Sequence, residues 1–157
     1  INAAGLTFLG YAGYGLMTNA AGSVARPTVV IPRAIFTDPP VGIVGMTEAE
    51  AAAAGHRCWC RPLPISLVPR AGAIRDTRGF IKMVADADTN EVLGVAMVGV
   101  NASEVIHEAA MAMRYRAKLV DFVDLLHVYP TMAEALKIVA LSFFKDVSKM
   151  SCCAGER

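Results

Sequence analysis

The chain has 157 residues and a formal net charge of +1, with acidic and basic residues interspersed along it. A near-neutral chain with no clustered basic face argues against nucleic acid as the main partner. Hydrophobic residues make up 55% of the chain, enough for one domain with a sizeable core. A small domain this apolar is expected to bury one face against a second copy or another domain.

The four cysteines do not form a disulfide framework, so a reducing cytoplasm is the expected compartment. They are Cys58, Cys60, Cys152 and Cys153. The apolar run at residues 3–17 is shorter than the roughly 20 residues of a membrane-spanning helix and lacks the basic start of a secretory signal. We therefore expect no membrane association. The chain begins with Ile1 rather than Met, which indicates a piece of a longer protein or a trimmed product.

The N-terminal half is expected to be mainly extended. Residues 1–31 form a glycine- and alanine-rich segment of unassigned role, within which residues 26–31 and Pro32 read as an edge strand. Residues 41–46 form a short apolar strand. Thr47 and Glu50 form a capping box that opens an alanine-rich helix, and Gly55 ends this helix.

The middle of the chain predicts a strand, a loop and a hairpin. In the strand at residues 56–64, period two places Cys58 and Cys60 on one face. An arginine-bearing loop follows at residues 65–78. The strands at 80–85 and 92–100 are joined by Asp-x-Asp-x-Asn, which is turn chemistry, and form a hairpin.

The C-terminal half is expected to be helical. A capping box at residues 101–104 opens a helix with Val105, Ala109 and Met113 on one stripe. A short helix covers 120–126, and a third capping box at 131–134 opens a helix to about residue 145. Strands first and helices last favour an α+β domain, an antiparallel β-sheet with helices packed on one side. No Gly-x-Gly-x-x-Gly follows a strand, so the chain shows no phosphate cradle for a flavin or nicotinamide.

Residues 148–157 are expected to form a flexible tail that carries Cys152 and Cys153. Two thiolates on a short tail can close around a soft metal ion of low coordination number. They are too few for a four-ligand zinc site. The alternative is an exposed cysteine pair with no role.

Several stretches resemble the C-terminal dimerisation domain of the flavin-dependent pyridine nucleotide–disulfide oxidoreductases. The family's His-Pro-Thr-x-x-Glu motif reads Tyr129-Pro130-Thr131-x-x-Glu134 here, with Tyr in the His position. We assign residues 32–147 to this dimerisation domain. The other matching stretches are Phe-Thr-Asp-Pro-Pro-Val at 36–41, Val-Gly-Met-Thr-Glu at 44–48, Gly-Phe-Ile-Lys at 79–82, Leu-Gly-Val at 93–95 and Ser-Cys-Cys-Ala-Gly at 151–155.

The resemblance implies a homodimer in which a His–Glu pair of one subunit serves the flavin and redox cysteines of the other. Tyr129 replaces that His, and a phenol with a pKa near about 10 is a poor base at neutral pH. Together, this Tyr and the Cys-Cys tail resemble the members that reduce Hg²⁺ to Hg⁰. The resemblance then implies that Tyr129 and Glu134 are catalytic, and that Cys152, Cys153 and Tyr129 bind Hg²⁺. It places FAD, NADPH and the inner redox cysteines on other domains, which leaves the isolated chain inactive.

Alternatives stay open at this point. The chain could be a stand-alone dimerising module that binds thiophilic metal without redox chemistry, while Tyr129 argues against an ordinary disulfide reductase. Glu134 could serve only as a capping residue. The expected roles of His107 and His127 are structural or at the surface. Cys-x-Cys can bind metal, but Cys58 and Cys60 are expected to be ordinary strand residues.

Overall fold

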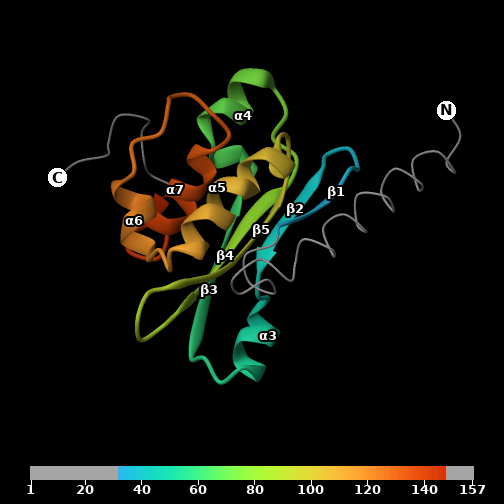
Figure 1. Cartoon of the computed structure of the whole chain (residues 1–157). Helices are drawn as coiled ribbons and strands as arrows, with labels where there is room; N and C mark the ends of the chain where they lie inside the picture. Colours follow the sequence, from blue (N-terminus) through green and yellow to red (C-terminus); the bar gives the residue numbers. More distant parts are fainter. Residues whose placement is uncertain (1–31, 148–157) are drawn as a thin grey trace, which may run out of the picture.

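The computed structural model describes residues 32–147, and the sheet in this part of the chain is antiparallel throughout (Figure 1). Its order is β1-β2-β5-β4-β3. The N-terminal segment, its expected strand up to residue 31 and the Cys-Cys tail lie outside the described residues. The strands are β1 (Arg33–Ile35), β2 (Val41–Gly45), β3 (Cys58–Pro64), β4 (Phe80–Asp86) and β5 (Val92–Val98).

The predicted hairpin is confirmed by the turn between β4 and β5. Asp86 accepts hydrogen bonds through Oδ1 from the backbone N–H groups of Asp88 and Thr89, each at 2.9 Å. Asn90 adopts a left-handed φ of 61°, which Asn tolerates better than most residues. The Asp-x-Asp-x-Asn stretch therefore closes the hairpin as its turn chemistry predicts.

Three helices pack on one face of the sheet and enclose the main core (Figure 1). They are α5 (Ala102–Arg114), α6 (Leu119–Asp124) and α7 (Glu134–Leu141). The stripe of Val105, Ala109 and Met113 on α5 is buried, as predicted. Within residues 32–147 no helix is long and apolar enough to span a membrane. The largest fully buried side chains include Ile65, Ile81, Met83, Met97, Ile106, Met113, Leu119 and Leu136.

The predicted antiparallel sheet flanked by helices is confirmed, but the helices are not confined to one side, because α3 (Glu48–Ala53) packs on the opposite face. The chain leaves β2 through Gly45, whose φ of 77° is readily adopted by glycine. Ala51 of α3 then packs with Val84 and Leu93 in a second, smaller cluster. Alternation along β4 and β5 supplies these side chains, since neighbouring residues of a strand point to opposite faces.

The predicted loop at residues 65–78 is wrong for most of its length. It contains a 3₁₀ turn, η1 (Ile65–Leu67), and a helix, α4 (Pro69–Ile74). Pro69 occupies the first turn of α4, where its missing N–H costs no hydrogen bond. Ile65, Val68 and Ala71 are fully buried. These buried residues are three positions apart, a spacing typical of helical turns. The arginines of the same stretch obscured this pattern in the sequence.

The three expected capping boxes have different outcomes. Thr47 caps α3 as predicted: its Oγ1 accepts from the Glu50 N–H at 3.2 Å, and Glu50 Oε2 accepts from the Thr47 N–H at 2.7 Å. Asn101 makes no side-chain cap to α5, because it adopts a left-handed φ of 60°.

The short helix α6 covers residues 119–124, against an expected 120–126.

The last helix is shorter than expected. α7 begins at Glu134, with Ala133 in the cap position and no side-chain cap. It ends at Leu141 rather than near residue 145. Isolated turns follow it, and the last of them is closed by a hydrogen bond from the Lys145 N–H to the Leu141 carbonyl at 3.0 Å. Half of the capping box remains, since Glu134 Oε2 accepts the N–H of Thr131 at 3.2 Å.

Candidate functional site

The loop at residues 125–133 joins α6 to α7 and carries Tyr129. Three contacts hold it against the helices. His127 Nε2 lies 2.9 Å from Glu108 Oε1 on α5, and Lys137 Nζ on α7 donates to the Leu125 carbonyl at 3.2 Å. Met132 is buried in the main core. Both ends and the middle of the loop are thus anchored.

The anchored loop presents Tyr129 and apolar side chains to the surface. Tyr129 is 54% exposed, while Leu126 and Val128 are 89% and 78% exposed. Such exposure of large apolar side chains is costly in water and is typical of interaction surfaces. Tyr129 lies among these exposed residues, so a group from outside residues 32–147 can reach its phenol.

Glu134 stabilises the turn that follows Tyr129 and Pro130. Its carboxylate accepts the Thr131 N–H at 3.2 Å, at the start of α7, where the helix dipole favours a negative charge. Thr131 Oγ1 is buried and has no hydrogen-bond partner in the described part of the chain. Glu134 thereby acts on the backbone of this loop, which assigns it a positioning role.

The structure describes only some of the other residues considered for the site. Cys152 and Cys153 lie outside the described residues. Among residues 32–147, no group of three or more His, Cys, Asp or Glu side chains is arranged to hold a metal ion. His107 is exposed on α5, and its Nδ1 lies 3.3 Å from the Glu104 carbonyl, in agreement with a surface role. His127 is only 5% exposed at its side chain and has the expected structural role.

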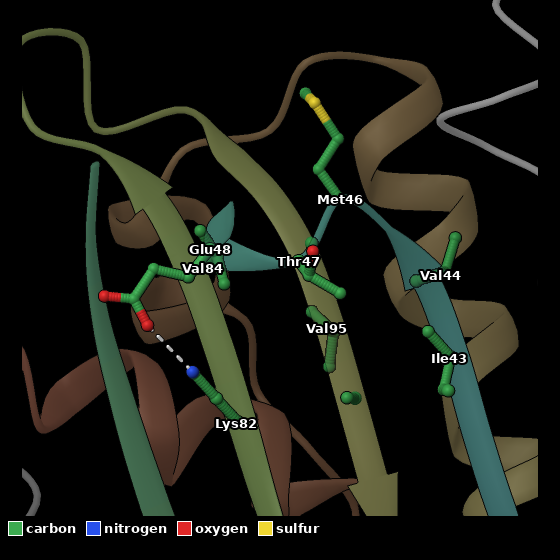
Figure 2. A pocket seen from close by; sticks show the side chains of 10 residues that line it. Ile43, Val44, Met46, Thr47, Glu48, Lys82, Val84 and Val95 are labelled. Carbon is green, nitrogen blue, oxygen red and sulfur yellow. Dashed lines mark hydrogen bonds and ion pairs between the residues drawn. The ribbon is translucent and has the colours of Figure 1, made fainter. Parts of the chain in front are cut away.

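A small cavity lies on the sheet face opposite α5 and α7 (Figure 2). Its volume is about 80 Å³, and Ile43, Val84 and Ala96 contribute to its lining. Glu48 Oε2 and Lys82 Nζ form an ion pair of 3.0 Å at this cavity. Pockets for drug-sized ligands and cofactors usually measure about 300–1,000 Å³. The cavity is therefore too small to hold a flavin or a nicotinamide dinucleotide.

The sheet of the described residues differs in topology from a dinucleotide-binding fold. Dinucleotide folds place the pyrophosphate at a glycine-rich turn between a strand and a helix of a parallel sheet. Here every strand pair is antiparallel. The chain after β2 reads Met-Thr-Glu, with no glycine-rich turn before α3.

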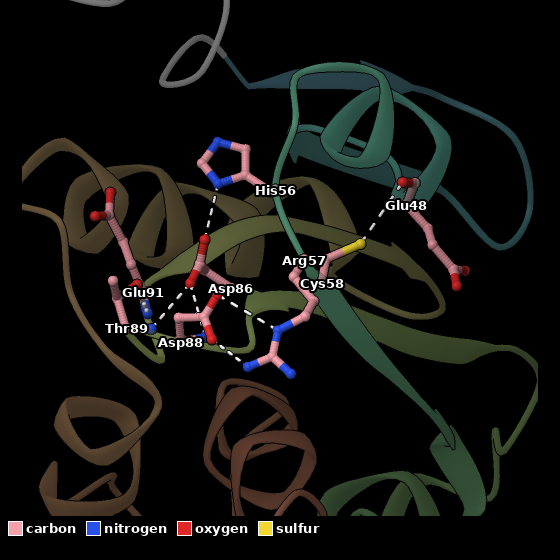
Figure 3. Close-up of polar contacts among 8 residues, drawn as sticks. All are labelled: Glu48, His56, Arg57, Cys58, Asp86, Asp88, Thr89 and Glu91. Atoms are coloured by element: carbon pink, nitrogen blue, oxygen red, sulfur yellow. Dashed lines mark hydrogen bonds and ion pairs between the residues drawn. The ribbon is translucent and has the colours of Figure 1, made fainter.

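A second polar cluster lies where β3 begins and β4 ends (Figure 3). His56 Nδ1 lies 2.8 Å from Asp86 Oδ2, and Arg57 pairs with Asp88. The His56 contact, followed by the backbone N–H groups of Thr89 and Asp88, holds the pKa of Asp86 well below its ordinary value. The cluster joins the start of β3 to the β4–β5 turn and serves the fold.

Within residues 32–147 these features define an α+β domain with a five-stranded antiparallel sheet and an exposed, helix-anchored loop. The family model of the pyridine nucleotide-disulphide oxidoreductase dimerisation domain matches residues 31–140. That is more than half of the chain, and the chain belongs to this family. Its dimerisation domain is of the mercuric reductase-like kind.

The relatives and solved structures agree with this assignment. The chain is 43% identical to a mercuric reductase of Lysinibacillus sphaericus over 92% of its length, and 44% identical to one of Bacillus cereus over 80%. It covers 27% and 20% of those proteins, so it spans about a quarter of the relatives it matches. The HOCl-induced flavoprotein disulfide reductase RclA of Escherichia coli has a TM-score of 0.70 and 32% identity, over 74% of this chain and 27% of that one.

Two contacts in the structure join residues that no sequence motif links. One is the His127–Glu108 contact, which spans 19 positions and has no sequence motif to reveal it. Another is the meeting of Cys58 and Cys60 with Glu48, which lies on a different element. The period-two placement of the cysteines was visible in the sequence, but their partner was not.

Proposed function

We propose that this chain is the dimerisation and metal-delivery part of a mercuric reductase-like enzyme that reduces Hg²⁺ to Hg⁰. The observation that carries the proposal is Tyr129. It stands in the His position of the family motif, on an exposed loop, in a chain 43% identical to a mercuric reductase. FAD and NADPH belong to the parts of the parent enzyme outside these residues, where they supply the two electrons that Hg²⁺ accepts.

Metal delivery is assigned to Cys152 and Cys153. Hg²⁺ is a soft cation that prefers thiolate ligands. Each exchange forms one mercury–sulfur bond as another breaks, so the ion passes between thiol pairs without a change of oxidation state. Overall, Hg²⁺ and NADPH give Hg⁰, NADP⁺ and one proton. The two terminal thiolates receive the ion and pass it to the inner redox cysteines.

Tyr129 is assigned a contact with the ion during this transfer. A phenol with a pKa of about 10 is protonated at neutral pH and cannot replace the proton-shuttling His of the disulfide reductases. Its oxygen can still approach the bound ion or donate a hydrogen bond. Glu134 holds the turn after Tyr129 through the Thr131 N–H and so fixes the direction of the loop.

The test of metal delivery uses the full-length parent enzyme. Replacing Cys152 and Cys153 by Ala should lower Hg²⁺-dependent NADPH oxidation by about 100-fold when the ion is presented as a dithiol complex, since loss of a positioned group commonly costs this much. Tyr129→Phe should lower kcat and leave flavin binding unchanged. Unaltered kcat/KM in the Cys variant would contradict the assignment.

The alternative function is a stand-alone dimerising module. It predicts that the chain binds Hg²⁺ and that its gene encodes no flavin domain.

Dimerisation is assigned to the helical side of the domain. Large apolar side chains are exposed there on three neighbouring segments, a pattern that interfaces between subunits show. The corresponding residues are Met111 and Tyr115 of α5, Val120 of α6, and Leu125, Leu126, Val128 and Tyr129 of the loop. The double variant Leu126→Glu and Val128→Glu should sediment as a monomer at micromolar concentration. Leu67→Glu, in η1 and outside this set, should stay dimeric. A monomeric wild-type chain would contradict the proposal.

A further inference from the structure

Cys58 and Cys60 lie on the same face of β3, and both sulfur atoms contact Glu48. Figure 3 shows the Cys58 contact. The Cys58 thiol approaches the backbone carbonyl of Glu48 at 3.8 Å. The Cys60 thiol donates to Glu48 Oε2 at 3.2 Å. Glu48 is the first residue of α3, which crosses this face of the sheet. The two thiols therefore contact the same residue, Cys58 at its backbone and Cys60 at its carboxylate, from alternate positions of an extended strand.

A cation completes the cluster from the next strand. Lys82 of β4 places its Nζ 3.0 Å from the same Glu48 Oε2 that accepts from Cys60 (Figure 2). Burial, followed by the Glu48 carboxylate, raises the pKa of the Cys60 thiol, and Lys82 acts in the opposite direction. Both cysteines are free and partly exposed. Solvent ions therefore reach thiols that already have an acceptor and a cation beside them.

The spacing of the two cysteines favours a bridging ion over a disulfide. Residues two apart on a strand are separated by roughly 6.6 Å at Cα. This is near the upper limit for a disulfide, which usually spans about 5.5–6 Å between Cα atoms. A two-coordinate soft cation with metal–sulfur bonds of about 2.3 Å adds roughly 4.6 Å between the sulfurs. An inserted ion thus suits a separation that would strain a direct bond.

We propose that Cys58 and Cys60 form a second, two-thiolate binding site for soft cations such as Hg²⁺, Ag⁺ or Cu⁺, beside the Glu48–Lys82 ion pair. This site stands apart from the terminal cysteines and does not depend on the proposed function of the chain. The ligand set of two sulfurs agrees with the finding that no group of three or more ligating side chains exists within residues 32–147. It therefore excludes a tetrahedral zinc centre and selects ions that accept two ligands.

Binding of a metal ion by the two cysteines releases protons. Two S–H bonds break and two metal–sulfur bonds form for each ion, so two protons leave and no electron is transferred. The Cys60 proton lies in a hydrogen bond to Glu48, and the carboxylate offers it a first acceptor. Lys82 keeps its ion pair with Glu48 and offsets the negative charge of the thiolate that forms. Affinity should accordingly rise with pH.

The first experiment titrates Hg²⁺ into the whole 157-residue chain carrying Cys152→Ser and Cys153→Ser. Ultraviolet charge-transfer absorption and proton release should show one ion bound and two protons released per chain. Adding Cys58→Ser or Cys60→Ser should weaken binding by about 100-fold, the gain expected from a second linked ligand. A large excess of Zn²⁺ should not compete. Failure of the Cys152/Cys153 variant to bind, or binding that survives both added substitutions, would overturn the site.

The second experiment separates the folded site from a simple Cys-x-Cys peptide. Ag⁺ binding against a soluble competing thiol is followed as a function of pH, on the same Cys152→Ser and Cys153→Ser background. Lys82→Met should move the midpoint to higher pH, because the thiolate loses its neighbouring cation. Glu48→Gln should move it to lower pH. Both shifts should vanish in chloride-free urea, and circular dichroism checks that the variants fold. Identical midpoints for all folded variants would contradict the proposed cluster.

The two experiments are separable from the test of metal delivery. Loss of the Cys58–Cys60 site leaves the terminal pair and its NADPH-linked assay intact. A chain whose terminal cysteines prove inactive can still bind Hg²⁺ between Cys58 and Cys60. Each result therefore addresses one pair of cysteines.

Discussion

Nε2 of His127 lies 2.9 Å from Oε1 of Glu108, and this contact ties the loop that carries Tyr129 to α5. The two residues belong to segments that no local motif links, and the His127 side chain is only 5% exposed. Its Nδ1 is buried with no hydrogen-bond partner among residues 32–147. A buried polar ring with one partner is a sensitive point of the fold, since loss of that partner leaves an uncompensated group.

His127→Ala should lower the free energy of unfolding by about 1–3 kcal/mol, because Glu108 loses its partner and the loop loses an anchor. Urea denaturation at neutral pH measures the change. The matched control is His107→Ala on the exposed side of α5, which should stay within about 0.5 kcal/mol of the wild type. Equal effects of the two substitutions would show that the His127 contact adds nothing.

Thr47→Ala should destabilise the domain by about 1 kcal/mol, the usual cost of removing a helix N-cap. The Thr47 hydroxyl accepts from the Glu50 N–H at 3.2 Å and donates to the Glu50 carboxylate at 2.8 Å, so both partners are affected. Thermal unfolding measures the loss. Thr77→Ala, at an exposed position before β4, is the control and should change the midpoint little.

Gly94→Ala should destabilise by about 1–3 kcal/mol or more, as overpacking does in closely packed regions. A Cβ at this position of β5 would clash with the backbone carbonyl of Met46, which has no flexible end to move aside. Gly72→Ala is the contrast. It lies in α4 with open space around its Cβ position and should stabilise by about 0.5–1 kcal/mol. Urea midpoints that rank the two variants the other way would refute the structural account.

Acid should weaken the domain through Asp86. The folded pKa of this carboxyl lies below the unfolded value of about 3.9, chiefly because of the His56 contact. A depressed pKa contributes stability that is fully present above the unfolded pKa and is lost as pH falls toward the folded one. Asp86→Asn should therefore be less stable at neutral pH and show a flatter pH dependence below about 4. Denaturation curves at several pH values test this, with exposed Asp124→Asn as control.

Much of the fold could be predicted because its signals are local. The capping box at Thr47 and the Asp86–Asn90 turn each satisfy backbone groups within a few residues, so the sequence alone displays both partners. α4 was missed because it buries only Ala71 and its stretch carries several arginines. Asn101 shows the limit of motif reading, since its left-handed backbone removes the cap that its sequence suggests.

By itself the sequence determined the antiparallel sheet, the helical C-terminal half, the resemblance to a dimerisation domain and the Tyr129 motif. Periodicity and turn chemistry act over a few residues, and a linear pattern carries them completely. Only the tertiary structure decided that α3 crosses the second face of the sheet and that His127 meets Glu108. It also decided that Cys58 and Cys60 share Glu48. These contacts join elements distant in the chain, and packing of the whole domain, rather than any local preference, brings their atoms together.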